Sequence, residues 1–307
     1  MKKIAVISLI AVAVIIGAVF AIGHFSDKNI GNETTTVSET ESTTETTTSV
    51  TVSWNGDEYK TVDNDGLVNI LLIGQDRREG EDRQRSDAMI LCSFNPETSK
   101  LSMISFLRDL YVQIPGYEDN RLNAAYAYGG FELLKETLEL NFGITVDGCL
   151  ESDFEGFKKI IDTIGGVEIE LNKEEAEIVG ANEGVCTLNG NQALTYARIR
   201  KIDSDFQRTE RQRKIMNSVF EKAKTYSLTE LAMFFSEIFP LMSTDMTDDE
   251  VMTLALTLAS SFEELETQSY SIPSQGNYEN ATIRGMAVLV PNLCEIKKLI
   301  FEEYLPM

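Results

Sequence analysis

The N-terminal segment restricts what the rest of the chain can form. Lys2 and Lys3 precede Ile4–Gly23, twenty residues without a charged side chain. As a helix, this length matches the hydrocarbon core of a bilayer. The flanking positive charge places the N-terminus in the cytoplasm and the bulk of the chain outside. A cleaved signal peptide is the alternative, since small residues occur at 18–21. The apolar core is longer than a usual signal sequence, which favours a single-pass anchor in the cell membrane.

A low-complexity segment follows the apolar one. Asn32–Val52 consists mainly of Thr, Ser and Glu, with no aromatic residue, lysine or arginine. This composition cannot bury enough apolar surface to fold and is typical of a linker. A flexible coil over 24–65 reaches about 35–40 Å. We therefore expect three parts: a cytoplasmic tip and transmembrane anchor at 1–23, an extracellular linker at 24–65, and one folded extracellular domain at 66–307.

The folded part mixes strand and helix patterns. Short apolar or alternating runs predict strands at Val68–Ile73, Met89–Phe94, Leu101–Phe106, Val167–Leu171 and Leu265–Pro273. Helical spacing and start signals predict helices at Phe131–Phe142, Phe154–Ile164, Asn191–Tyr196, Asp205–Ala223 and Asn292–Tyr304, with two more after capping boxes at Ser227–Glu230 and Thr247–Glu250. This order predicts an α/β fold, a three-layer α/β/α sandwich around a central mixed sheet.

Charge and histidine content exclude several classes of function. The formal net charge of -22 argues against a general nucleic-acid binder. The one histidine, His24, lies beside the apolar segment, which excludes Ser-His-Asp and Cys-His catalysis and histidine-rich zinc sites. Any metal would be a hard ion with oxygen ligands, such as Mg²⁺ or Mn²⁺. The four cysteines form no C-x-x-C pair; we expect Cys92 to be buried and assume no disulfide.

The arginines are unevenly distributed. Of twelve, six lie between Arg77 and Arg121 and five between Arg198 and Arg213. The guanidinium group binds phosphate or carboxylate through a rigid fork of donors. Two such clusters on an acidic chain indicate either a local anion site or surface ion pairs.

The first cluster surrounds two aspartates. Asp76 follows the strand that ends before Gly74, and Asp87 precedes the next strand. Ligands of α/β sheets collect at the carboxyl ends of strands, where two carboxylates can hold Mg²⁺ or act as a base. Arg78 and Arg85 lie in the same stretch. A solvated charged loop is the alternative reading.

Arg108-Asp109 follows the third predicted strand directly, so it too is expected at a strand end. It could equally be a local ion pair. The stretch Asn123–Gly130, with paired glycines, predicts a loop before the helix at Phe131, in which the Asn123 side chain supports a turn.

The second cluster has informative spacing. Arg198 and Arg200 are two residues apart, so in the extended segment expected at Ala197–Ile202 they would point to the same face. In the next helix, Asp205, Arg208 and Gln212 share one side, which continues into the apolar Ile215 and Val219. A charge on a core-facing side is costly without compensation. Either carboxylates such as Asp205 neutralise it, or it faces an anionic ligand in a cleft.

Seven segments in order, LLIGQDRR, RSDAMI, SFLRDLYVQIPG, LNAAYAYGG, IGGVEI, LNGNQALTYARIR and DFQRTERQ, resemble the LytR-CpsA-Psr family of envelope glycopolymer transferases. They span Leu71–Gln212, nearly half the chain. The resemblance implies transfer of a polyprenyl-pyrophosphate-linked glycopolymer, of the teichoic acid or capsule type, to a hydroxyl of peptidoglycan. A phosphodiester forms and polyprenyl phosphate leaves.

The resemblance also implies roles for particular residues. Asp76 and Asp87 would hold Mg²⁺ (or Mn²⁺), and the residues that would bind the pyrophosphate are Arg85, Arg108, Arg198, Arg200, Arg208 and Gln212. From the residues themselves we add Arg78 and Asn123 as binding candidates, Asp109 as a candidate base and Asp205 in support. Three positions depart from the usual pattern, Gln75, Leu107 and Gln207, and none removes a charge.

The family fold encloses a hydrophobic tunnel for the lipid, and the helices Phe131–Phe142 and Phe154–Ile164 are expected walls. The predicted partners are thus a lipid-linked glycan donor, a peptidoglycan acceptor and the bilayer, and no nucleic acid. Two other functions keep the same pocket: a polyprenyl-pyrophosphate pyrophosphatase, and a non-catalytic envelope protein that binds or senses lipid-linked glycan.

Overall fold

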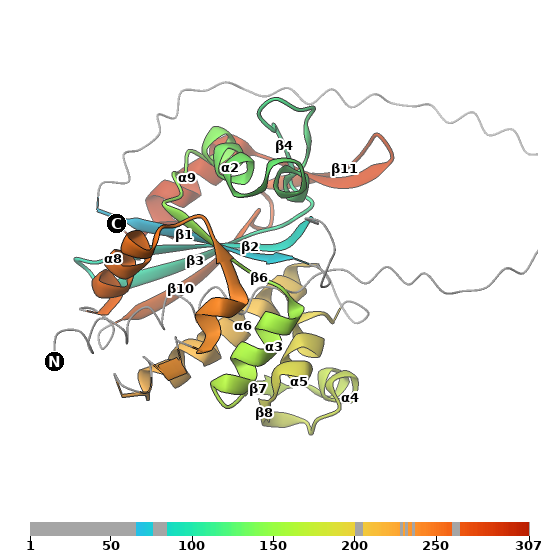
Figure 1. Ribbon diagram of the computed structural model, residues 1–307. Helices are drawn as coiled ribbons and strands as arrows, with labels where there is room; N and C mark the ends of the chain where they lie inside the picture. The colour runs from blue at the N-terminus through green and yellow to red at the C-terminus, as the bar shows by residue number, and fades with distance from the viewer. Residues whose placement is uncertain are drawn as a thin grey trace, which may run out of the picture.

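The computed structural model describes residues 66–75, 85–199, 205–227, 230, 233–234, 237–259 and 265–306 (Figure 1). The expected anchor and linker, Asp76, Arg78 and Arg200 lie outside these residues, as does the side chain of Asp205. None of the helices in the described part of the chain is both long and apolar enough to cross a bilayer.

A six-stranded sheet forms the centre of the domain. Its strands, in spatial order, are β10 (Glu266–Ile272), β3 (Lys100–Phe106), β2 (Ser86–Asn95), β1 (Val68–Gln75), β6 (Gly148–Ser152) and β9 (Met242–Thr244). β1 runs parallel to β6, and β10 runs parallel to β3, whereas β2 is antiparallel to both β1 and β3. The carboxyl ends of β1, β3, β6 and β10 and the amino end of β2 therefore meet at one edge.

The central strands are apolar throughout because both faces of the sheet are covered. In β1, Ile70 and Leu72 join one buried cluster, while Leu71 and Ile73 join the other. β2 divides in the same way, with Cys92 in the first cluster, 3% exposed, as the sequence predicted. This alternation explains why a continuous hydrophobic run folds as a strand here.

Helices cover both faces. On one face lie α2 (Leu122–Phe142) and α9 (Leu293–Leu299), the latter continued by one π-helical turn at Ile300–Tyr304 (Figure 1). The other face carries the larger set, α3 (Phe154–Thr163), α4 (Lys173–Val179), α5 (Gly190–Ala197), α6 (Asp205–Lys224) and α8 (Asp248–Ala259), with a short 3₁₀ turn at Phe239–Leu241. The predicted α/β fold with a central mixed sheet is confirmed.

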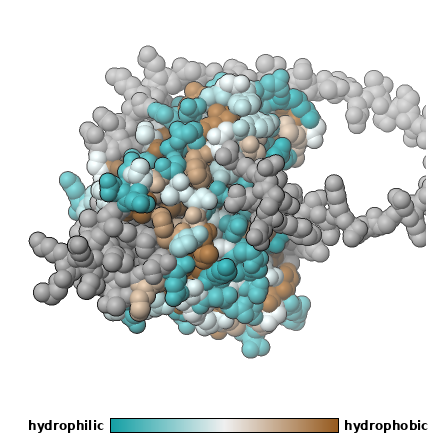
Figure 2. Space-filling model, viewed as in Figure 1, coloured by the Kyte–Doolittle hydropathy of each residue, from teal (hydrophilic) through white to brown (hydrophobic). Residues whose placement is uncertain are grey.

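Three small two-stranded sheets lie outside the central one. They pair β4 (Tyr111–Val112) with β5 (Asn120–Arg121), β7 (Val167–Leu171) with β8 (Gly184–Leu188), and β11 (Tyr278–Ile283) with β12 (Met286–Pro291). The strand predicted at Val167–Leu171 exists, but it belongs to a hairpin and not to the central sheet. The β11–β12 hairpin has no counterpart among the predicted elements. In the view of Figure 2, hydrophilic residues cover most of the described surface, and hydrophobic ones form small separate patches.

The loop predicted at Asn123–Gly130 is wrong. α2 begins at Leu122 and breaks only at Gly130, whose φ of 69° and ψ of -147° lie outside the helical region. Ala and Leu favour a helix before the glycines, and Gly130 alone absorbs the change of direction. The predicted stop is confirmed, since Gly143 caps α2 in the left-handed conformation.

The tunnel was predicted between the sheet and helices, with Phe131–Phe142 and Phe154–Ile164 as walls. The expectation that both helices line one tunnel is wrong, whereas a tunnel between the sheet and one of them stays a prediction. Leu134 and Leu138 of α2 belong to the buried cluster on one face of the sheet, and Phe157 and Ile160 of α3 belong to the cluster on the opposite face. The sheet separates the two helices, so they cannot wall one tunnel.

Candidate functional site

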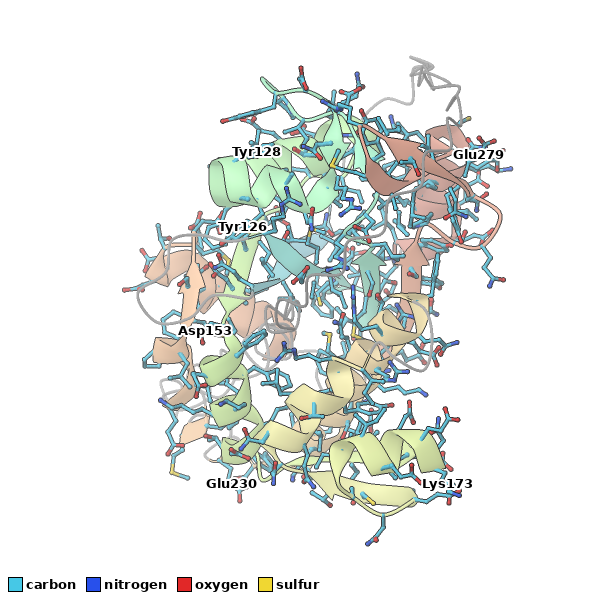
Figure 3. The ribbon with its side chains drawn as sticks, turned by 90° about the vertical axis from the view of Figure 1, so that its right-hand side faces the viewer. Tyr126, Tyr128, Asp153, Lys173, Glu230 and Glu279 are labelled. Atoms are coloured by element: carbon cyan, nitrogen blue, oxygen red, sulfur yellow. The ribbon has the colours of Figure 1, made fainter. Side chains whose placement is uncertain are left out.

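Three of the predicted site residues, Asp87, Arg108 and Asp109, lie at the edge at which the four carboxyl ends meet. Arg108 follows β3, Asp87 lies near the start of β2, and Glu151 lies near the end of β6. In Figure 3, which is turned to look from the right-hand side of Figure 1, Tyr126 of α2 lies above the sheet and Asp153 lies below it. The prediction that polar groups would collect at strand ends is thus supported for these residues.

A bulge in β2 places Asp87. Gln75 of β1 pairs with Ser86 and Gly74 pairs with Ala88, so Asp87 is the extra residue between them. A bulge re-aims a side chain out of the normal alternation. The Asp87 side chain is 5% exposed, and its Oδ1 accepts a hydrogen bond of 2.8 Å from Nη1 of Arg108. The sequence placed Asp87 before the strand; the structure places it within the strand.

Asp109 joins two arginines. Its Oδ2 lies 3.5 Å from Nε of Arg108, and its Oδ1 lies 3.3 Å from Nε of Arg121. Asn123 is 4% exposed in the first turn of α2, and its backbone N–H donates to the carbonyl of Arg108 at 3.3 Å. The backbone of α2 therefore helps to fix the position of Arg108. Arg121 was counted in the first arginine cluster but was not among the predicted site residues.

Part of the second arginine cluster lies on α6, which packs on the face of the sheet opposite to α2. Arg208 and Gln212 are 3% and 2% exposed, and Ile215 and Val219 of the same side are fully buried. The core-facing side predicted from their spacing is confirmed. The Asp205 side chain lies outside the described residues, so its expected supporting role stays a prediction.

Two further arginines of α6 have local partners. Arg211 is 3% exposed, donates from Nε to Glu175 Oε1 at 2.9 Å and from Nη1 to the carbonyl of Ile199 at 3.0 Å. Arg213 donates to the carbonyl of Tyr270 at 3.4 Å, and burial lowers the pKa of its guanidinium. These contacts assign Arg211 to a structural pair and not to the candidate site.

Arg198 lies at the end of α5, not in an extended segment. α5 continues to Ala197, and Arg198 has φ -100° and ψ 2° because its N–H still bonds back to the helix. Its guanidinium lies 4.7 Å from the ring centroid of Phe154, the first residue of α3, which follows β6 after one residue. This cation–π contact holds Arg198 near the same edge of the sheet. Arg200, its predicted partner on that face, lies outside the described residues.

The first arginine cluster is only partly described. Arg85 is exposed and immediately precedes β2. Asp76 and Arg78 lie outside the described residues. Among the described residues no group of three His, Cys, Asp or Glu side chains could hold a metal ion. Asp87 alone is then the described carboxylate available from the predicted pair, and its Oδ2 has no hydrogen-bond partner in the described part of the chain.

A buried network at the same edge was not predicted. Glu151 is 5% exposed; its Oε1 accepts from the Gln75 side chain and its Oε2 accepts from the Tyr126 hydroxyl at 2.5 Å. It ties the end of β1 to β6 and α2, and so fixes the strand end that precedes Asp76 in the sequence. Glu151 stands in a short polar stretch, CLES, whose sequence carries no strand signal strong enough to place it.

Tyr126→Phe is expected to destabilise the domain by about 1–3 kcal/mol, because a buried acceptor loses its donor. Urea unfolding of the full-length protein, followed by circular dichroism, measures the change. Tyr128→Phe is the matched control on the same helix, since Tyr128 is 41% exposed. Equal effects for the two variants would contradict the structural role given to Glu151.

Comparisons with known proteins identify the family of this chain. The sequence profile of the LytR_cpsA_psr family matches residues 27–299. The polyisoprenyl-teichoic acid–peptidoglycan teichoic acid transferase TagU of Oceanobacillus iheyensis is 37% identical over 204 residues, which are 62% of this chain and 63% of that protein. The match therefore spans less than two thirds of that relative's length.

Another relative has a different kind of name. The regulatory protein MsrR of Staphylococcus aureus is 31% identical over 237 residues, covering 75% of this chain and 72% of that protein. Among solved structures, TagT bound to LIIa-WTA superposes with a TM-score of 0.65 at 26% identity, covering 81% of this chain and 94% of that one. The chain belongs to the LytR_cpsA_psr family.

Proposed function

We propose that this protein transfers a glycopolymer from a polyprenyl pyrophosphate to a hydroxyl of peptidoglycan. The observation that carries the proposal is the Arg108–Asp87 pair at the strand-end edge, with Arg208 and Gln212 buried in the first half of α6. Arginines at this edge suit the two phosphates of a pyrophosphate. The relative named as a teichoic acid transferase and the TagT structure bound to LIIa-WTA support the same chemistry.

The proposed reaction breaks one phosphorus–oxygen bond and forms another. The acceptor hydroxyl attacks the phosphorus on the glycan side, its proton passes to a carboxylate, and polyprenyl phosphate leaves with the bridging oxygen. Negative charge grows on both phosphates, and preorganised guanidinium groups stabilise that charge. Asp87 and Asp109 are the described carboxylates beside Arg108; which of them takes the proton stays open, as it did from the sequence, where Asp76 was also available.

The carboxylate oxygens of this site are of the kind that bind Mg²⁺. Mg²⁺ binds in proteins through one or two carboxylates together with substrate phosphates, and so needs no complete protein cage. We propose that Asp87 holds it, with Asp76 as the second ligand. The ion would supply positive charge to the phosphate oxygens.

We propose further that the protein acts at the outer surface of the cell membrane, held by its N-terminal segment. The support is the uncharged stretch Ile4–Gly23 with its lysine flank, and the linker that follows. A lipid-linked donor and a protein anchored in the same bilayer meet without either leaving it.

Product analysis tests the proposal against its two rivals. The full-length protein in detergent is incubated with a lipid-linked glycan pyrophosphate and Mg²⁺, with and without peptidoglycan fragments. We expect polyprenyl phosphate to accumulate together with joined glycan, and EDTA to suppress both. Release that is equally fast without acceptor would indicate a pyrophosphatase. Binding without turnover would indicate a regulatory or sensing protein, the class to which the name of the S. aureus relative points.

A further inference from the structure

The β11–β12 hairpin forms one wall of a groove beside the candidate site. The groove has a volume of about 500 Å³, and its opposite wall is formed by Leu107, Asp109 and Phe206. Asp109 directly follows Arg108, and Phe206 precedes Arg208 by two residues. Neither arginine lines the groove itself, but the segments that carry them each contribute a lining residue. In Figure 1 the hairpin projects from the domain on the face that carries α2.

Several contacts fix the hairpin against the site. The N–H of Leu289 donates to the carbonyl of Asp109 at 2.9 Å, and Nε of Arg121 donates to the carbonyl of Ala287 at 3.0 Å. Arg121 also lies 3.3 Å from the carboxylate of Asp109. These contacts thus connect the hairpin wall of the groove directly to the Arg108–Asp109 turn.

The lining of the groove combines aromatic rings with neutral polar groups. The rings of Phe206 and Tyr278 pack against each other in the lining, with centroids 5.6 Å apart and planes inclined by 31°. Asn280 and Thr282 follow Tyr278 at alternate positions of β11, so the three side chains share one face of the hairpin. Both Asn280 and Thr282 are exposed and can donate and accept hydrogen bonds.

The charged groups in the lining limit which ligands the groove can bind. The lining contains one carboxylate, Asp109, and neither lysine nor arginine. A phosphate-bearing segment would find no cation there, and a polyprenyl chain would cover the exposed Asn280 and Thr282 without satisfying them. An uncharged sugar, with apolar C–H faces and hydroxyl and amide groups, matches both kinds of surface.

We infer that this hairpin groove binds a sugar of the acceptor glycan and presents its hydroxyl to the pyrophosphate. The inference rests on the proposed transferase function and adds a location for the acceptor. Asp109 lines the groove and its carboxylate lies 3.5 Å from Nε of Arg108, so a sugar bound there would meet the donor phosphates on the Arg108 side.

Binding and kinetics of full-length variants in detergent test the inference. The probe is a tetrasaccharide of alternating N-acetylglucosamine and N-acetylmuramic acid, titrated by calorimetry without donor. We expect Asn280→Ala combined with Thr282→Val to raise its Kd by at least about tenfold, since two hydrogen bonds are lost. In the transfer assay the acceptor KM should rise similarly, with the donor KM unchanged. Glu279→Ala, at the intervening position of the same strand, is the matched control and should bind as the unaltered protein does.

Two results would overturn the inference: an unchanged Kd in the double variant, or a rise in the donor KM in place of the acceptor KM. Failure of the proposed function is a separate outcome. A protein that binds the tetrasaccharide through Asn280 and Thr282 but joins no glycan retains the groove and loses the transferase assignment. A protein that joins glycan equally well in both variants retains the transferase assignment and loses the groove.

Discussion

Arg108→Ala is expected to lower kcat/KM for glycan transfer by about a thousandfold, the scale on which a phosphate-stabilising arginine acts. The variant removes the guanidinium group that is proposed to bind the pyrophosphate. It also leaves the Asp87 carboxylate, 5% exposed, without its 2.8 Å partner. Arg108→Lys should recover only a small part of the rate, because a lysine keeps the charge but lacks the fork of donors.

The measurement is the initial rate of joined-glycan formation, with circular dichroism to establish that the variant is folded. Lys214→Ala is the control, since Lys214 is 52% exposed and pairs with Glu210 on the same helix, and it should leave the rate within about twofold. Full activity of Arg108→Ala would remove this residue from the site and with it the assignment of Asp87.

Arg211→Ala is expected to destabilise the folded domain by about 3–5 kcal/mol, the usual cost of removing one member of a buried ion pair. Glu175 would remain buried without its guanidinium partner, and the carbonyl of Ile199 would lose a donor. Denaturant unfolding measures the loss. The same variant should bind lipid-linked donor normally at a temperature where it remains folded, because the Arg211 guanidinium is held by Glu175 and the carbonyl of Ile199.

Lys214→Ala is the matched control on α6. Lys214 is 52% exposed and pairs with Glu210 one turn away, so its loss should cost no more than about 0.5 kcal/mol. An Arg211→Ala variant as stable as this control would show that the Arg211–Glu175 pair does not hold α6 to α4.

The sequence could predict those features whose residue pattern lies within one helix or strand. β1, β2 and β3 were predictable because their residues are buried on both faces, which leaves long apolar runs. The buried side of α6 was predictable because Arg208 and Gln212 continue into Ile215 and Val219 at helical spacing. Both patterns are local and repeat along one element.

The failures involve contacts between elements distant in sequence. β6 and β9 carry few apolar residues, and only pairing with β1 and with each other reveals them as strands. The Glu151–Tyr126–Gln75 network and the hold of Arg121 on Asp109 join segments that no spacing rule connects. The paired glycines before Phe131 suggested a loop, although only Gly130 leaves the helical conformation.

The sequence predicted which charged residues form the site, but not how their side chains are arranged in space. Strand-end position correctly brought Asp87 and Arg108 together, but the bulge that aims Asp87 depends on the pairing of β2 with β1. The sequence also left the acceptor without a location. The β11–β12 hairpin supplies one through its contacts with Asp109 and Arg121.

The proposed transferase function requires that the pyrophosphate be cleaved by transfer, with the glycan-side phosphorus kept in the product. The most direct measurement uses a lipid-linked donor labelled at that phosphorus, incubated with the full-length protein, Mg²⁺ and peptidoglycan fragments. We expect the label to become covalently attached to peptidoglycan as a phosphodiester, with unlabelled polyprenyl phosphate released in equal amount. Label recovered as free glycan phosphate, with none on peptidoglycan, would contradict it.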